Sequence, residues 1–310
     1  MSDLSPPVTP DAPRPAWPST PLGAPWSSAF RWFLRLVVWS SVWVAGAVAS
    51  LSLFAQAALG LELSWAPIAL VFVSALFIYN LDHVIDARVQ QIDDAEARRY
   101  FRSGAVRAFT ALAGVGVALG VALAPPAAWP VFATYALVGV LYGVPLIPAA
   151  GGRRAWRLKD VPFSKGLLVG FSVAVGTVGM PLAYAGRGLS EAAVFVAVFV
   201  FVFVSSNTHV CDIPDVPSDR RAGVRTLPAS LGVRHTKRAL VSVNLLLLAA
   251  MSWGWGRGLT GLHVEMMLSL CASVVYILAV HARTRREVFG VLVDGAAFLP
   301  ALLHAAGHAR

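Results

Sequence analysis

The chain has 310 residues, of which 57% are hydrophobic and 13% are charged. A soluble globular domain has roughly a quarter of its residues charged, so this composition argues against a soluble fold and indicates a polytopic membrane protein. The net charge of +9 could suggest a nucleic-acid partner, but the basic residues are distributed as a membrane topology would distribute them, so we expect no nucleic-acid binding. The two cysteines, Cys211 and Cys271, offer no disulfide framework or zinc spacing.

Proline-rich residues 1–28 contain little that could form a core. They predict a disordered cytoplasmic tail, followed by one transmembrane domain over residues 29–310. Apolar segments then recur to the end of the chain, and several are shorter than the ~20 residues of an average spanning helix. We count nine of them, at residues 32–59, 63–85, 105–124, 127–147, 163–184, 192–211, 239–255, 262–280 and 288–303. The predicted fold is all-α, with about nine transmembrane helices.

The basic residues alternate between loops. Nineteen of the 25 Lys and Arg residues follow the second, fourth, sixth and eighth segments. The positive-inside rule places those loops and the N-terminus in the cytoplasm, and nine spans place the C-terminus outside. We therefore expect an integral protein of the cytoplasmic (inner) membrane whose functional loops face the cytoplasm.

Three carboxylates follow the sixth segment, at Asp212, Asp215 and Asp219. Their i, i+3 and i+4 spacings would put them on one face of a helix, where they would repel one another unless a cation held them. Mg²⁺ prefers carboxylate oxygens and keeps open positions for phosphate oxygens. Arginines suited to phosphate come directly afterwards, at Arg220, Arg221 and Arg225. This stretch predicts a magnesium–diphosphate site at a membrane face.

A second acidic pair, Asp82 and Asp86, lies one helical turn apart at the end of the second segment. The second and sixth segments end on the same side of the membrane, so the two clusters could face each other across a central cavity. The alternative is that nearby arginines simply cap this pair. His83 and His209 are expected to be packed side chains, whereas the lone intramembrane Asp294 suggests a role in a cavity or in helix pairing.

These residues resemble the UbiA family of intramembrane prenyltransferases. The sequence DIPDVPSD followed by RRAGVRTLPASLG is similar to the second of the family's two aspartate-rich motifs, and LYGVPLIP…WRLKDVPFSKGLLVG is similar to its loop between helices 4 and 5. The segment RYFRSG at residues 99–104 is a looser match. The first motif departs from the family pattern, because Ile78 and Tyr79 stand where Asn and Asp are expected and Asn80 sits two positions late.

The resemblance implies Mg²⁺-dependent transfer of a prenyl group from an isoprenyl diphosphate to a lipophilic acceptor, often an aromatic ring. The implied metal ligands are Asp82, Asp86, Asp212, Asp215 and Asp219. Of these, Asp82, Asp86, Asp215 and Asp219 would also be catalytic. The implied diphosphate ligands are Arg99, Lys159, Arg225 and Tyr142. Aromatic side chains such as Tyr79, Tyr142 and Phe163 could stabilise the allylic cation by cation–π contact.

Two other functions remain open from the sequence. One is an enzyme of the same family that prenylates a non-aromatic acceptor or cyclises a prenyl chain. The other is a membrane protein that keeps the fold without catalysis and binds a prenyl lipid or a partner, which the divergent first motif favours. Magnesium-dependent consumption of an isoprenyl diphosphate distinguishes the enzyme from the non-enzyme.

Overall fold

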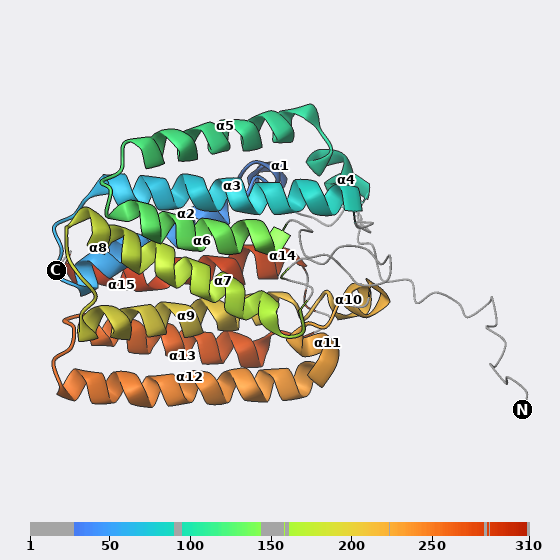
Figure 1. Cartoon of the computed structure of the whole chain (residues 1–310). Coiled ribbons are helices and arrows are strands. Elements are labelled where there is room, and N and C mark those ends of the chain that lie inside the picture. The colour runs from blue at the N-terminus through green and yellow to red at the C-terminus, as the bar shows by residue number, and fades with distance from the viewer. Residues whose placement is uncertain are drawn as a thin grey trace, which may run out of the picture.

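The structure is a computed structural model that describes residues 28–89, 95–143, 158, 161–222, 224–281, 284 and 286–308. Regular structure in these ranges is entirely helical. The long helices run side by side along one direction, and the short helices α4 (Ala95–Phe101), α10 (Val216–Ala222) and α11 (Leu227–Leu231) lie at one end of the bundle (Figure 1). The last helix ends at the opposite end. The predicted tail over residues 1–28 lies, apart from its last residue, outside the described part of the chain.

Six helical segments are long and apolar enough to cross a membrane, and three shorter apolar helices accompany them in the described residues. These segments coincide with the nine apolar segments of the sequence. The prediction of an all-α membrane protein is confirmed, whereas the count of nine spans stays a prediction. The uninterrupted helices are α3 (Trp65–Val89), α5 (Gly104–Ala122), α6 (Ala128–Gly143), α9 (Glu191–Cys211), α12 (Val233–Gly256) and α13 (His263–Ala279).

The first apolar segment is broken. It consists of α1 (Ser28–Phe33), the π-helical turn η1 (Leu34–Val38) and α2 (Val42–Ala58), and Ser41 between them has a left-handed backbone with φ 63°. The side chain of Asn80 on α3 donates a hydrogen bond to the Ser40 carbonyl at 2.8 Å. A backbone carbonyl freed by a helix break needs such a partner inside a membrane protein. The break coincides with the consecutive serines Ser40 and Ser41, which the count of apolar segments passed over.

Two further segments contain π-helical turns. The fifth consists of α7 (Ser164–Ala174), η4 (Val175–Gly179) and α8 (Met180–Tyr184). The last consists of α14 (Arg286–Val288), η5 (Phe289–Val293), the 3-10 turn η6 (Ala296–Phe298) and α15 (Leu299–His308). Side chains from neighbouring helices donate to carbonyls of η5: Trp43 to Val291 at 3.0 Å and Asn207 to Val293 at 3.3 Å. These bonds satisfy backbone groups that the widened turn leaves without a regular helical partner.

The largest cluster of buried hydrophobic residues comes mainly from α2, α9 and the fifth segment, α7 to α8. Helices α7 and α9 approach closely at Gly170, where an added Cβ would lie 2.1 Å from Ser205 Oγ and 2.7 Å from the Phe201 carbonyl oxygen. Small residues at such crossings allow the close backbone approach that holds membrane helices together. Helices α5 and α12 lie on opposite outer faces of the bundle (Figure 1) and carry exposed leucines that suit contact with lipid, such as Leu119 and Leu246.

Candidate functional site

An ion pair joins the start of α7 to the end of α9. The ammonium of Lys165, the second residue of α7, pairs with Asp212 Oδ1 directly after α9. Asp212 is only 1% exposed, and its second oxygen, Oδ2, has no hydrogen-bond partner. The ring of His209 lies one turn earlier, with Nδ1 4.0 Å from that oxygen. This end of the bundle therefore contains a buried carboxylate with one acceptor oxygen left unused.

The three aspartates of the second motif extend from the end of α9 into α10, so they do not share one regular helix. Helix α9 ends at Cys211, a turn follows, and α10 begins at Val216. Backbone hydrogen bonds compact this turn, from Asp215 N to Asp212 O at 3.2 Å and from Asp219 N to Asp215 O at 2.8 Å. Lys165 interacts electrostatically with all three carboxylates. The three aspartates thus lie in one short turn region, and Lys165 pairs directly with the first of them.

Asp219 is held by the loop that follows α10. The Thr226 hydroxyl donates a hydrogen bond to Asp219 Oδ2 at 2.8 Å. Burial raises the pKa of Asp219 to about 6, although Lys165 and the Thr226 hydrogen bond act in the opposite direction. The predicted diphosphate ligand Arg225 is exposed, and its carbonyl accepts a hydrogen bond from Phe163 N at 3.1 Å, which ties this loop to the start of α7.

The first motif lies on the last turns of α3, where Asp82 and Asp86 are both partly exposed. Tyr142, at the end of α6, interacts electrostatically with Asp82 of the first motif, with Asp212 of the second and with Lys165. Both aspartate-containing helix ends are therefore within electrostatic range of one tyrosine. That the two clusters face each other stays a prediction.

Other predicted residues lie elsewhere. Asn80 does not turn towards the aspartates, because its amide nitrogen donates to the carbonyls of Ser40 and Leu76. The His83 ring stacks on Phe101, with centroids 4.6 Å apart, as expected of a packed histidine. Arg99 is exposed on α4, and Phe163 is exposed at the residue before α7. The predicted diphosphate ligand Lys159 lies outside the described residues.

The aspartate oxygens at this end of the bundle are of the type that Mg²⁺ prefers as ligands. Among the described residues, no group of three or more His, Cys, Asp or Glu side chains is close enough to hold a metal ion by itself. Mg²⁺ sites often need fewer protein ligands, because one or two carboxylates, water and substrate phosphates complete the octahedron. The unpartnered Oδ2 of Asp212, beside Asp215 and Asp219, fits such a shared site.

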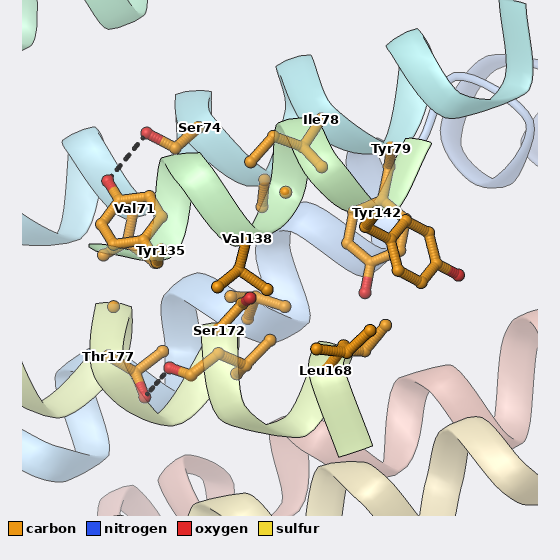
Figure 2. Close-up of a pocket in the computed structure, with 16 residues that line it drawn as sticks. Val71, Ser74, Ile78, Tyr79, Tyr135, Val138, Tyr142, Leu168, Ser172 and Thr177 are labelled. Atoms are coloured by element: carbon orange, nitrogen blue, oxygen red, sulfur yellow. Dashed lines mark hydrogen bonds between the residues drawn. The ribbon is translucent and has the colours of Figure 1, made fainter. Parts of the chain in front are cut away.

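A pocket extends from this end into the bundle between α3, α6 and α7 (Figure 2). Its empty volume is about 590 Å³ with its open side included, and no charged side chain lines it. Tyr79 and Tyr142 stand at one end, while the hydrogen-bonded pair of Ser74 and Tyr135, 3.1 Å apart, stands at the other (Figure 2). Because Tyr142 also interacts with Asp82 and Asp212, the aromatic end of the pocket adjoins the carboxylates.

Tyr79 also connects the pocket to the last segment. It interacts electrostatically with Asp82, Cys211 and Asp294. The Cys211 thiol donates a hydrogen bond to Asp294 Oδ1 at 3.4 Å. The intramembrane carboxylate Asp294 therefore faces the bundle interior, where an acidic residue in a spanning segment is expected to lie.

Lys165 was missed as a site residue by the sequence prediction, which counted it among the basic residues that set topology. A signal was nevertheless present. A cation in the first turn of a helix is disfavoured by the helix dipole, so a lysine at the start of an apolar segment indicates a compensating acidic partner. The pocket-lining hydroxyls of Ser74, Tyr135 and Ser172 left no linear signature, because they come from three different helices.

The chain is similar in sequence to proteins of a known family. A sequence model of the UbiA prenyltransferase family matches residues 95–290. A lycopene elongase/hydratase of Haloferax volcanii is 30% identical over 169 residues, which are 52% of this chain and 50% of that protein. A lycopene elongase/hydratase of Halobacterium salinarum is 24% identical over 193 residues, 60% of this chain and 66% of that protein. The chain thus spans about half the length of the first relative.

Solved structures share the fold at low sequence identity. A UbiA homolog from Archaeoglobus fulgidus, bound to GPP and Mg²⁺, superposes with a TM-score of 0.57 and 12% identity over 87% of this chain and 99% of that one. The apo structure of a UbiA homolog from Aeropyrum pernix K1 gives a TM-score of 0.59 and 14% identity over 86% of this chain and 98% of that one.

Proposed function

Because this chain belongs to the UbiA prenyltransferase family, we propose that it is a membrane enzyme that transfers a prenyl group from an isoprenyl diphosphate to a lipophilic acceptor, using Mg²⁺. The observation that carries this proposal is the uncharged pocket whose aromatic end adjoins the carboxylates of both motifs. A prenyl diphosphate has the matching shape, with an anionic head and an apolar chain. The reaction is a transfer of an alkyl group other than methyl.

The head of the donor would bind at the end of the bundle. Asp82 and Asp86 on α3 and Asp212, Asp215 and Asp219 after α9 would hold Mg²⁺, which neutralises the diphosphate as the C–O bond breaks. Lys165, Arg225, Arg99 and Lys159 carry the positive charge available to the remaining phosphate oxygens. The positive-inside distribution of these loops supports a cytoplasmic position for this end.

The chain of the donor would lie between α3, α6 and α7. Tyr79 and Tyr142 stand where the head meets the chain, so their rings can face the allylic carbon as positive charge develops. The uncharged walls exclude water, which would otherwise trap the cation as an alcohol. Diphosphate leaves with the electron pair of the broken C–O bond, the π electrons of the acceptor form the new bond to the allylic carbon, and a proton then leaves the acceptor.

The relatives suggest that polyenes should be tested as acceptors in addition to aromatic rings. Two of them are lycopene elongase/hydratases, and the pocket has hydroxyl groups but no charged side chain with which to orient a polar ring. A hydrocarbon acceptor needs only apolar walls and a nearby cation.

The test is diphosphate release by purified protein from isoprenyl diphosphates of increasing length, with aromatic or polyene acceptors, with Mg²⁺ or with EDTA. We expect release with Mg²⁺, loss of release with EDTA, and a fall of at least about 100-fold in Asp215→Asn, because this carboxylate stabilises charge in the transition state. The matched control is Glu191→Gln, which removes a carboxylate at the opposite end of α9. Absence of release from every donor and acceptor pair by folded protein would refute the enzyme and favour the non-catalytic alternative.

A further inference from the structure

The position of Lys165 among the aspartates bears on how a metal could enter. Its ammonium pairs with Asp212 and interacts electrostatically with Asp215 and Asp219, which are the carboxylates proposed to hold Mg²⁺. A cation therefore already offsets part of the negative charge of this cluster in the metal-free protein. Burying the Asp212 carboxylate without such a partner would be costly.

The ammonium and a divalent ion compete for the same carboxylate, because Lys165 pairs with Asp212 Oδ1 and the metal would bind the neighbouring Oδ2. An incoming Mg²⁺ that binds Asp212 must remove the lysine or tolerate its positive charge a few ångströms away, where like charges repel strongly at the edge of a low-dielectric bundle. The lysine needs a new anionic partner if it moves. The four-carbon stem of lysine is flexible enough to exchange one partner for another.

A diphosphate supplies that partner. Tyr142, which lines the pocket proposed for the prenyl chain, also interacts electrostatically with Lys165. An anionic head at the aromatic end of the pocket would thus lie near the ammonium. On binding, the lysine can pass from the carboxylate to a phosphate oxygen and leave Asp212 available to the metal.

We infer that Lys165 is an internal counter-ion of the metal site, which blocks metal binding in the empty protein and couples metal entry to the arrival of the diphosphate. This inference rests on the proposed function and specifies how the two ligands bind: donor and metal bind together, whereas metal alone binds weakly. Lys165 is also a ligand of the diphosphate in the loaded state. The coupling is reciprocal, so metal strengthens diphosphate binding by the factor by which diphosphate strengthens metal binding.

The experiment measures Mn²⁺ alone, as a probe of the Mg²⁺ site, by titration calorimetry on full-length, tag-free protein in detergent. We expect weak binding to the wild type and at least tenfold tighter binding to Lys165→Met, because the competing charge is gone. Lys165→Arg keeps the charge and should resemble the wild type. The matched control is Lys237→Met, since Lys237 donates to the carbonyls of Leu278 and Val280 instead of to a carboxylate; its Mn²⁺ affinity should stay within twofold of the wild type.

Equal or weaker Mn²⁺ binding by folded Lys165→Met would overturn the inference. If Lys165→Met does not fold, the decision falls to Asp212→Asn, which releases the ammonium from its partner. Inorganic diphosphate in EDTA should bind to Asp212→Asn at least tenfold more tightly than to the wild type. The gain in affinity should be larger than that of Asp215→Asn, which removes a neighbouring carboxylate but leaves the ion pair intact. Equal gains in the two variants would also overturn the inference. The proposed function fails separately, if the wild type releases no diphosphate from any donor in the presence of Mg²⁺.

Discussion

The ammonium of Lys165 pairs with the buried carboxylate of Asp212, and the two residues are 47 positions apart in the sequence. The pair fixes the start of α7 against the end of α9 at the point where the pocket meets the aspartates. It therefore has a structural role in addition to its place in the proposed site, and the two roles can be separated by measurement.

Removing one member of this pair should destabilise the metal-free protein, and removing both should restore much of the loss. Asp212→Asn or Lys165→Met leaves a buried or partly buried charge without its partner, which we expect to cost about 2 kcal/mol, below the range for fully buried pairs because Lys165 remains partly exposed. The stabilities of the wild type, the two single variants and the double variant are measured by thermal unfolding in detergent without Mg²⁺. Strictly additive losses would contradict the coupling.

Asn80→Ala should lower stability while leaving the magnesium dependence of diphosphate release unchanged. The amide of Asn80 donates to the carbonyls of Ser40 and Leu76, so its loss removes two hydrogen bonds at the break in the first segment, about 1–3 kcal/mol in all. Asp82→Asn, two residues along the same helix, should have the opposite pattern, with little effect on unfolding and a higher Mg²⁺ requirement. A raised Mg²⁺ requirement in Asn80→Ala would show that Asn80 reaches the metal.

Ser172→Phe should shorten the donor that the protein accepts. Ser172 lies in the middle of the pocket on α7 (Figure 2), so a phenyl group there fills the space of several isoprene carbons. We expect release from the longest accepted donor to fall at least about tenfold, while release from a dimethylallyl donor changes little. Leu167→Phe on an exposed face of the same helix is the control. Equal losses for long and short donors would argue against this pocket as the site of the prenyl chain.

Gly170→Ala should weaken the contact between α7 and α9. The added Cβ would lie 2.7 Å from the Phe201 carbonyl oxygen, so backbone must move, at a cost of about 1–3 kcal/mol. Gly116→Ala on α5 is a matched change whose Cβ would meet Val73 side-chain atoms at an ordinary 3.7 Å. Unfolding temperatures of the two variants in the same detergent provide the comparison. A Gly170→Ala protein as stable as Gly116→Ala would show that this crossing has room to relax.

The sequence by itself determined the membrane character, the all-helical class and the family. These follow from the composition, from the length of the apolar segments and from the linear motif over residues 212–232, all of which are local in the chain. The sequence also indicated that the carboxylates at the end of α3 and after α9 belong to one end of the bundle. Spans of fixed length bring alternate loops to the same side, and this requires no knowledge of packing.

Only the tertiary structure decided which side chains meet. The pairing of Lys165 with Asp212, the bond from Asn80 to Ser40 and the contact of Cys211 with Asp294 join residues 40 or more positions apart. Such contacts depend on helix rotation and on crossing points such as Gly170, where the absence of a side chain sets the separation of two helices. Hydrophobic periodicity indicates little about how each helix of a membrane protein is rotated about its axis, because both the lipid-facing and the buried faces are apolar. The breaks in the first, fifth and last segments were also not predicted, because the count of apolar segments did not consider the serine, glycine and proline residues within them.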